Sequence, residues 1–451
     1  MFDKFPLTLC DGWRMEAAGP FFYEQHCDTE NILAFPPFFS HETDSDTERR
    51  EDNYLYPLMT YRRYGSEYRW QLCQIINFSG GQNPGDGTAK RFTIFPLYFQ
   101  QRAPDESLKY TALVPFYGHL ENRLFRDDIF FVMFPFYSET RKKDIVTDNY
   151  AYPIVHFRHG NGLSGWQVWP IAGHEGKVVT LLTNNWDEVI TNGGHDYFFA
   201  AWPFYFHHLD GIGTTDPQNT LAAIPFYVKF RSPLRDSTTV LWPFFNWIDD
   251  RERKYHEWEM PWPFIVVARG EGKTQTRVMP FFQRAHTDTL TDNFYAWPIY
   301  GYKRIQSAPL DRNETRICFY LVRDVNEKNT ETGRARKRLD FWPLFVYHRD
   351  FNGDSRLQIP ALIESFVPNN EGVERDWSPL WSVWRSEKNP AEDESSQSLL
   401  WNLWRRDTAE GMKNDSLLFG LFQYHSDAEM TKLRLFYIPV FRHENAKPPD
   451  K

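Results

Sequence analysis

Apolar and polar residues alternate along much of the chain with the period of two that is typical of β-strands. Between Leu221 and Arg231, every second residue from Ala222 to Phe230 is apolar and falls on one face of an extended chain, whereas Lys229 and Arg231 fall on the other. Phenylalanine, isoleucine, valine and tyrosine fill many of these positions, and all four favour strands. Clusters of glycine, asparagine and aspartate separate such segments and predict turns. The pattern therefore predicts an all-β fold.

A short motif accompanies this alternation along the chain. It consists of an aromatic or large aliphatic residue, then proline, an apolar residue and often phenylalanine or tyrosine. Copies of the motif begin at Phe95, Val114, Phe134, Trp202, Trp242 and Trp342. Self-similarity at a regular spacing indicates a repeat architecture. We therefore expect a single repeat-built all-β domain over residues 1–451, with candidate insertions at residues 176–196 and 324–340.

The spacing of the motif prolines sets the expected size of a repeat. Most of these prolines lie 17 to 22 residues apart, which leaves room for one strand of about 12–14 residues and a polar turn. Because proline cannot donate a hydrogen bond to a β-ladder, we expect a bulge, a kink or a break in the middle of nearly every strand. The whole chain then holds about 22 strands, or about 11 hairpins.

Arginine recurs six residues after the motif proline. The positions are Arg63, Arg102, Arg141, Arg231, Arg269, Arg304, Arg349 and Arg385. A parallel solenoid would stack such arginines about 5 Å apart, where like charges repel one another. The pattern therefore favours antiparallel strands in a closed or ring-like barrel, since residues on both faces near each proline are apolar and need cover. A β-solenoid or a β-propeller is the alternative.

The tandem units resemble repeats in uncharacterised bacterial proteins that carry strings of the form Leu/Trp-Pro-Leu/Phe-Phe/Tyr. The hairpin ring is also similar in its inferred shape to the β-flower proteins, which are shallow barrels with hairpin petals and have been likened to the lipid-binding tubby fold. These resemblances imply a ring-like β architecture. The second one also implies lipid as a candidate ligand for the aromatic centre of the ring.

Composition and charge narrow the class of protein. Aromatic residues make up 18% of the chain, which excludes a disordered protein. The net charge is −9, whereas a general nucleic-acid binder needs a basic face, so we expect no nucleic acid as a partner. No stretch of about 18 apolar residues occurs, so we expect no transmembrane helix.

The N-terminal residues and the cysteines bear on the compartment. The chain begins without an apolar segment typical of a secretory signal. We therefore expect a cytoplasmic protein, and the cell envelope is the alternative if a leader has been removed. Cys10, Cys27, Cys73 and Cys318 are scattered without a Cys-x-x-Cys motif. Such spacing predicts four reduced thiols and neither a disulfide framework nor a zinc site.

No catalytic motif is found in the sequence, and neither a cofactor nor a metal ion is predicted. The candidate ligand-binding residues come from the repeat itself. Tryptophans that precede the proline could line the wall of a site for an apolar ligand, or could simply anchor the core. Arginines six residues after the proline could meet a polar head group. The candidates are Trp202, Trp242, Trp262, Trp297, Trp342, Arg231, Arg269, Arg304 and Arg349.

Three functions are compatible with these features. The first is a non-enzymatic binding or scaffolding protein, since the repeat is uniform and carries no catalytic constellation. The second is a carrier of an apolar ligand such as lipid, held in the aromatic centre of the ring. The third is a glycan-binding protein or a glycosidase, which rests on abundant aromatic and carboxylate side chains. The partner is accordingly an unknown protein or an apolar small molecule, and an oligomer is compatible with all three.

Overall fold

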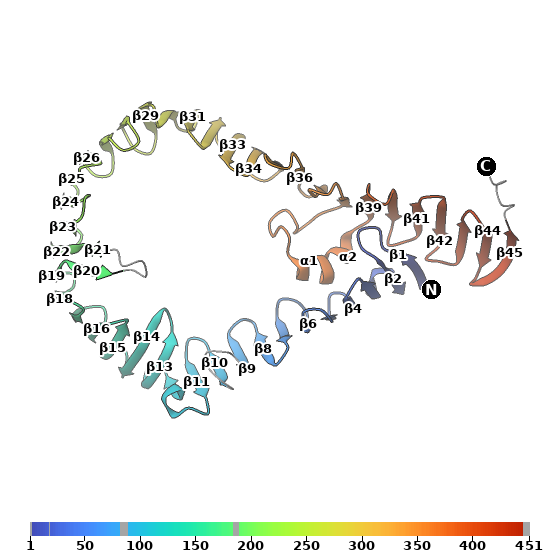
Figure 1. Ribbon diagram of the computed structural model, residues 1–451, viewed down its shortest axis with the longest axis horizontal. Helices are drawn as coiled ribbons and strands as arrows, with labels where there is room; N and C mark the ends of the chain where they lie inside the picture. Colours follow the sequence, from blue (N-terminus) through green and yellow to red (C-terminus); the bar gives the residue numbers. More distant parts are fainter. Residues whose placement is uncertain (1, 18, 82–88, 184–188, 445–451) are drawn as a thin grey trace. The chain divides into compact units, whose positions relative to one another are not determined.

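The computed structural model describes residues 2–17, 19–81, 89–183 and 189–444. These residues form 45 strands, two short α-helices and two short 3-10 helices (Figure 1). The chain divides into two compact units. Unit 1 consists of Met1–Asn83 and Pro298–Lys451, and unit 2 consists of Pro84–Trp297.

Unit 1 contains the first and the last strands of the chain. Its N-terminal part comprises β1 (Phe2–Pro6), β2 (Gly12–Ala17), the 3-10 helix η1 (Gly19–Phe21), β3 (Phe22–Cys27), β4 (Glu30–Phe35), β5 (Phe39–Asp44), β6 (Arg49–Tyr54), β7 (Met59–Tyr64), β8 (Glu67–Leu72) and β9 (Ile76–Gly80). Its C-terminal part comprises β33 (Tyr300–Ser307), β34 (Leu310–Ile317), β35 (Val322–Asn329), β36 (Ala335–Phe341), β37 (Phe345–Arg349), β38 (Ser355–Ile359), α1 (Glu371–Asp376), α2 (Ser378–Trp381), β39 (Trp384–Asn389), β40 (Glu394–Leu399), β41 (Trp404–Ala409), β42 (Met412–Leu417), β43 (Phe422–Ser426), β44 (Met430–Leu435) and β45 (Ile438–Glu444).

Unit 2 contains only strands and one 3-10 helix among its described residues. They are β10 (Lys90–Ile94), β11 (Tyr98–Arg102), η2 (Glu106–Leu108), β12 (Tyr110–Leu113), β13 (Tyr117–Arg123), β14 (Arg126–Val132), β15 (Tyr137–Lys142), β16 (Ile145–Tyr150), β17 (Val155–Gly160), β18 (Leu163–Val168), β19 (Ala172–Lys177), β20 (Thr180–Thr183), β21 (Val189–Asn192), β22 (Gly194–Ala200), β23 (Tyr205–Ile212), β24 (Gln218–Ala223), β25 (Tyr227–Arg231), β26 (Arg235–Val240), β27 (Phe245–Asp250), β28 (Tyr255–Glu259), β29 (Ile265–Gly270), β30 (Lys273–Val278), β31 (Phe282–Thr287) and β32 (Leu290–Tyr295).

The strands follow one another as an antiparallel meander, and 43 of them belong to one open sheet. In the pair β12–β13, for example, Ala112 lies opposite Gly118. The predicted ring of about 22 strands is therefore wrong, because the sheet has about twice as many strands and does not close. The antiparallel pairing also excludes a parallel solenoid, and one continuous sheet is not a set of propeller blades.

The position of the motif proline explains the error in strand count. In the segment Ile94–Leu97, the amide of Leu97 donates to the carbonyl of Ile94 at 2.7 Å, and the Phe95–Pro96 peptide bond is cis. This is a tight turn of type VI with proline at its third position. Since proline has no amide hydrogen, a turn tolerates it better than the centre of a sheet does. Each repeat therefore holds two strands of about five or six residues joined by a Pro turn, rather than one long strand.

The two candidate insertions differ in structure. Between β19 and β22, which pair with each other, β20 and β21 form a separate two-stranded sheet. This addition lies within residues 176–196, of which 184–188 are outside the described part of the chain. Residues 324–340, by contrast, run through β35 and β36, whose ladder is regular from Val322 opposite Phe341 to Lys328 opposite Ala335.

Burial within the sheet is unusual because many buried side chains are polar. Ser40, Asn53 and Asp340 are fully buried at strand positions. Apolar burial is local: in unit 2, a small cluster joins Phe99, Tyr110, Ala112, Leu120 and Phe131. Many large aromatic residues lie at the turns and are exposed, although strands expose others, such as Trp166 and Trp247. The turns therefore present a row of apolar residues along an edge of the sheet.

The cysteine prediction is also wrong in part. Cys10 and Cys27 form a disulfide with their Cα atoms 5.8 Å apart, whereas Cys73 and Cys318 are free and exposed. The hairpin β2–β3 brings the first two together, since Gly12 lies opposite Cys27 in its ladder. A separation of 17 residues carries no recognisable motif, so the pairing could be found only from the register of this hairpin.

Candidate functional site

The Pro turns of unit 2 join into a continuous row along one edge of the sheet. Two strands separate successive Pro turns, so all of them fall on the same edge. Neighbouring turns also hydrogen-bond to each other: the amide of Val114 donates to the carbonyl of Leu97 at 2.7 Å, and the amide of Met133 donates to that of Phe116 at 2.6 Å. A corresponding backbone hydrogen bond links each following pair of neighbouring turns, up to the turn that contains Phe281. We call the turns around Pro96 to Pro280 the turn row.

The turn row is apolar and exposed. Each of its turns presents at least one large apolar side chain with more than a third of its surface exposed. These exposed side chains are Phe95, Leu97, Phe116, Met133, Phe134, Phe136, Tyr152, Ile154, Trp169, Ile171, Trp202, Phe204, Phe226, Leu241, Trp242, Phe244, Trp262, Phe264 and Phe281. A contiguous apolar surface of this kind is typical of an interaction site.

The predicted tryptophans all lie in turns. Trp202, Trp242 and Trp262 belong to the turn row, Trp297 lies in the turn that follows β32, and Trp342 lies in a Pro turn of unit 1. All five are exposed rather than buried in a core. Rings of successive turns approach one another, as shown by Trp169 and Trp202, whose centroids are 6.2 Å apart.

The predicted arginines lie away from these tryptophans. Arg231 and Arg269 each stabilise the hairpin to which they belong through the same set of hydrogen bonds. In each guanidinium, one amino nitrogen donates to two backbone carbonyls and the other donates to a threonine hydroxyl. Arg304 makes a two-point ion pair with Asp311, at 3.0 and 2.6 Å. Arg349 is exposed at the end of β37. Because a strand separates these arginines from the Pro turns by about 13 Å or more, the structure does not bring the two sets together.

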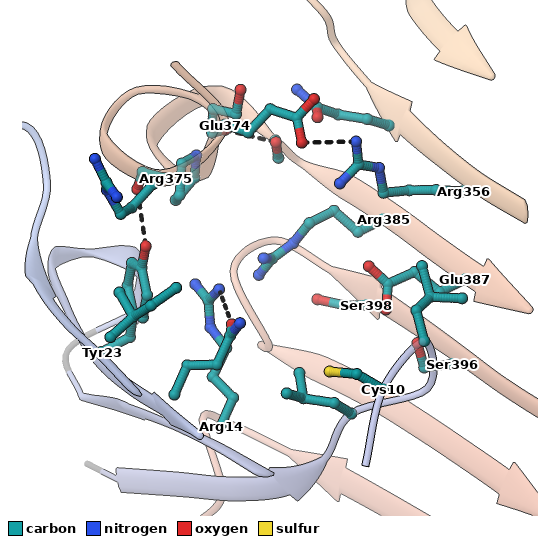
Figure 2. Close-up of a pocket in the computed structure, with 18 of the residues that line it drawn as sticks. Cys10, Arg14, Tyr23, Arg356, Glu374, Arg375, Arg385, Glu387, Ser396 and Ser398 are labelled. Carbon is teal, nitrogen blue, oxygen red and sulfur yellow. Dashed lines mark hydrogen bonds and ion pairs between the residues drawn. The ribbon is translucent and has the colours of Figure 1, made fainter. Parts of the chain in front are cut away.

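A second candidate site is a polar cavity of about 370 Å³ within unit 1. Figure 2 shows its lining, in which Arg14 from β2 and Arg385 from β39 point toward each other. The N-terminal strands form one wall, and α1, α2 and β38–β41 form the other. Residues more than 300 positions apart therefore meet here. We use the name clasp for the charged residues that line this cavity and join the two parts of unit 1, with Arg375 and Glu16 at its two centres.

The most buried part of the clasp surrounds Arg375 of α1. Its guanidinium binds Glu42 and, at 3.0 Å, Glu51, and its Nε lies 3.6 Å from Asp376. Burial favours the neutral form of Glu51, but the hydrogen bond from Asn53 and the charge of Arg375 outweigh it and lower the pKa of Glu51 to about 2. The pKa of Arg375 is raised, because the surrounding carboxylates outweigh the effect of its burial. Both groups are therefore ionised, and neither has solvent to replace its partner.

Glu16 of β2 is the second centre of the clasp. Its carboxylate binds Arg14 at 2.8 Å and Arg385 at 3.3 Å, and it accepts a hydrogen bond from Asn402. Burial alone would raise the pKa of Glu16, but Arg14 and Arg385 lower it. The carboxylate therefore joins β2 to β39 and to the turn before β41.

Tyr23 of β3 adds a neutral contact to the clasp. Its hydroxyl donates to the backbone carbonyl of Arg375 at 3.0 Å, and the guanidinium of Arg14 lies 3.7 Å from the centre of its ring. Burial raises the pKa of Tyr23 to about 12, so the phenol is neutral at physiological pH. Figure 2 shows its hydroxyl directed at the helical segment.

The ion pairs of its arginines indicate that the clasp has a structural role. Arg356 binds Glu374 at 2.8 Å, and Arg405 binds Asp407 at 2.7 Å. Each arginine that lines the cavity thus has a carboxylate partner, which is what two polar sheet surfaces need when they pack together. Sequence reasoning missed the clasp because its members do not follow the repeat. The available signal was the glutamates inside predicted strands, such as Glu51.

Other kinds of site are scarce in the described residues. The only group of three potential metal ligands there is Cys10, Cys27 and Asp28, and the disulfide uses both of its thiols. No helix in this part of the chain is long and apolar enough to cross a membrane. The chain matches no protein-family model, and no curated protein is found to be similar to it.

Proposed function

We propose that the protein is a non-enzymatic binding protein that holds an apolar partner on the turn row of unit 2. The observation that carries this proposal is the continuity of the row, because turns linked by backbone hydrogen bonds expose an aromatic or aliphatic side chain at every step. Removing such a surface from water stabilises a complex by about 25 cal/mol per Å² of apolar area. A pre-formed backbone lowers the entropic cost of binding.

The lining of the clasp supports the same assignment. Its arginines and carboxylates neutralise one another and hold the strands of unit 1 together, so the cavity offers no apolar surface comparable with the turn row. The strand interiors of unit 2 carry polar residues that bond across hairpins, as Arg231 does with Thr238. We therefore place the binding surface at the edge of the sheet, where the exposed apolar side chains belong to turns linked by hydrogen bonds.

Retention on a phenyl-substituted chromatography matrix tests the proposal. The variant Trp202→Ser/Trp242→Ser/Trp262→Ser removes three exposed rings from the turn row. The matched control, Trp166→Ser/Trp247→Ser/Trp258→Ser, removes three rings from strands of the same unit. The two sets are equally exposed, at 48, 47 and 41% against 43, 40 and 42%. We expect the turn variant to elute clearly earlier than both the wild type and the control, and equal elution of the two variants would refute the proposal.

A further inference from the structure

Unit 1 shows what kind of molecule fits a Pro turn, because its own chain contacts two Pro turns and one related turn without proline. The segment of residues 360–382, which includes α1 and α2, leaves the strand meander between β38 and β39. We call it the cover segment. It touches the Pro turns at Tyr56 and Trp342 and the related turn at Tyr320.

The contacts at Trp342 combine a hydrogen bond with ring packing. The indole Nε1 of Trp342 donates to the backbone carbonyl of Leu362 at 2.9 Å. The ring of Phe366 packs edge-on against Trp342 at 5.6 Å and against Tyr320 at 6.3 Å between centroids. An exposed tryptophan of a turn thus takes both an acceptor and an aromatic ring from the same irregular segment.

The turn at Tyr56 is contacted in a complementary way. Here Trp377 of the cover segment donates from its indole Nε1 to the carbonyl of Tyr56 at 2.7 Å. Gly372 lies so close to the ring of Tyr56 that a Cβ atom built on it would be 2.5 Å from the ring carbon Cζ. Trp377 also packs on Trp381 with the two rings nearly parallel. Backbone carbonyls, glycine and aromatic rings are therefore the groups that bind these turns.

The turn row of unit 2 repeats the chemistry of Trp342 without a cover segment. Trp202, Trp242 and Trp262 precede a cis proline just as Trp342 does. Among the described residues, no atom accepts a hydrogen bond from the indole nitrogens of these three tryptophans. An acyl chain would cover the rings but offers no acceptor along its length, whereas a polypeptide offers a carbonyl at every residue.

We propose that the partner held by the turn row is a polypeptide segment that carries aromatic residues and has no β-structure, similar in chemistry to the cover segment. This inference rests on the proposed function and specifies its partner. Tryptophan nitrogens of the turns donate to the carbonyls of the segment, and its aromatic side chains pack between the rings of successive turns. The recognition resembles the docking of irregular or proline-rich peptides on aromatic surfaces.

The experiment uses a labelled synthetic peptide with the sequence of residues 360–382, added to the full-length protein and followed by fluorescence anisotropy. The variant Trp202→Phe/Trp242→Phe/Trp262→Phe keeps three aromatic rings but removes their indole donors. Its control is Trp166→Phe/Trp247→Phe/Trp258→Phe on the strands. We expect the turn variant to bind the peptide at least tenfold more weakly than the wild type, and the control to bind it unchanged. Because unit 1 is identical in all three proteins, a difference locates the site in unit 2.

The alternatives give separate results. Equal binding of the peptide by the wild type and the turn variant, or no binding by either, overturns the inference. Neutral phosphatidylcholine vesicles serve as the lipid probe in a sedimentation assay. If vesicles are held through the turn row and the peptide is not, the partner is lipid, and the proposed function stands while the inference falls. If the phenyl matrix also fails to distinguish the serine variants, both fall.

Discussion

Units 1 and 2 are built from the same hairpins, yet they differ in what those hairpins contact beyond their neighbours. In unit 1, Arg375 pairs with Glu51 across 324 positions of sequence, and the cover segment lies on three turns. In the described part of unit 2, the hydrogen bonds and ion pairs stay local: they link strands that are neighbours in the meander or are separated by one strand, as Arg158 of β17 and Glu175 of β19 are. The comparison shows that one local pattern supports two outcomes. Unit 1 uses its surfaces to bind itself, whereas the turns of unit 2 stay exposed, and we propose that they bind a partner.

The largest expected effect comes from removing the central charge of the clasp. Arg375→Met leaves Glu42 and Glu51 buried without a cation, and such a loss costs about 3–5 kcal/mol of folding free energy. Hydrogen exchange followed by mass spectrometry should show faster exchange in peptides of unit 1 and unchanged exchange in unit 2. The control Arg231→Met, on an exposed hairpin of unit 2, should change stability by about 1 kcal/mol or less. A uniform rise in exchange over both units would contradict the division described above.

Acid should weaken unit 1 before unit 2. The folded-state pKa of Glu51 is about 2, against an ordinary value of 4.5. The unfolded chain therefore binds more protons between these values, and the stabilisation present above pH 4.5 is lost as the pH falls toward 2. Urea unfolding at pH 6, 4 and 3 should show this loss in the wild type, and a smaller loss in Glu51→Gln.

A second acidic residue provides the control for this pH dependence. The pKa of Asp236 in unit 2 is also lowered, chiefly by the hydrogen bond from Arg251, but about a third of its side chain is open to solvent. Solvent screening makes such a pair worth little, so Asp236→Asn should keep the acid sensitivity of the wild type. Equal flattening of the pH profile by Asp236→Asn and Glu51→Gln would show that the clasp has no special role.

A smaller effect is expected where the cover segment meets its turn. Gly372→Ala places a Cβ atom 2.5 Å from the ring of Tyr56, so helix α1 must move, at a cost of about 1–3 kcal/mol. Limited trypsin digestion should cut the cover segment faster in this variant than in the wild type. Gly301→Ala is the matched control in unit 1, because no atom lies within 4 Å of the added methyl group. Unchanged digestion of Gly372→Ala would mean that the segment does not depend on this contact.

Local pattern predicted the class of the fold but not its size. Period-two alternation and the recurring proline correctly indicated an all-β chain of hairpins. The strand count failed at the prolines: the alternation runs from Ala222 through Pro225 to Phe230 without a break, although a turn separates β24 from β25. Two short strands and a turn have the same length as one long strand. In the structure, the hydrogen bond from the amide of Phe226 to the carbonyl of Ala223 marks the turn.

The two candidate sites were predictable to different degrees. The tryptophans before the prolines could be singled out from sequence because the repeat fixes their position, although their exposure at an edge depends on where the turn falls. The clasp could not be predicted, because the partners of Arg375 and Glu16 come from opposite ends of the chain. No local signal specifies which buried glutamate meets which arginine. The Cys10–Cys27 pair was missed for a related reason, since it depends on the register of one hairpin.

The strictly sequential pairing of strands in unit 2 has a consequence for how this kind of chain varies in length. In the described part of that unit, the strands pair with their neighbours in the sequence. The exception is the pair β20–β21, which forms a separate sheet. One hairpin can therefore be duplicated or deleted with the remaining ladder intact, as in other proteins whose repeats contact only their neighbours. Each such event would add or remove one Pro turn. The number of positions available to a partner could thus change in steps, without any change to the clasp.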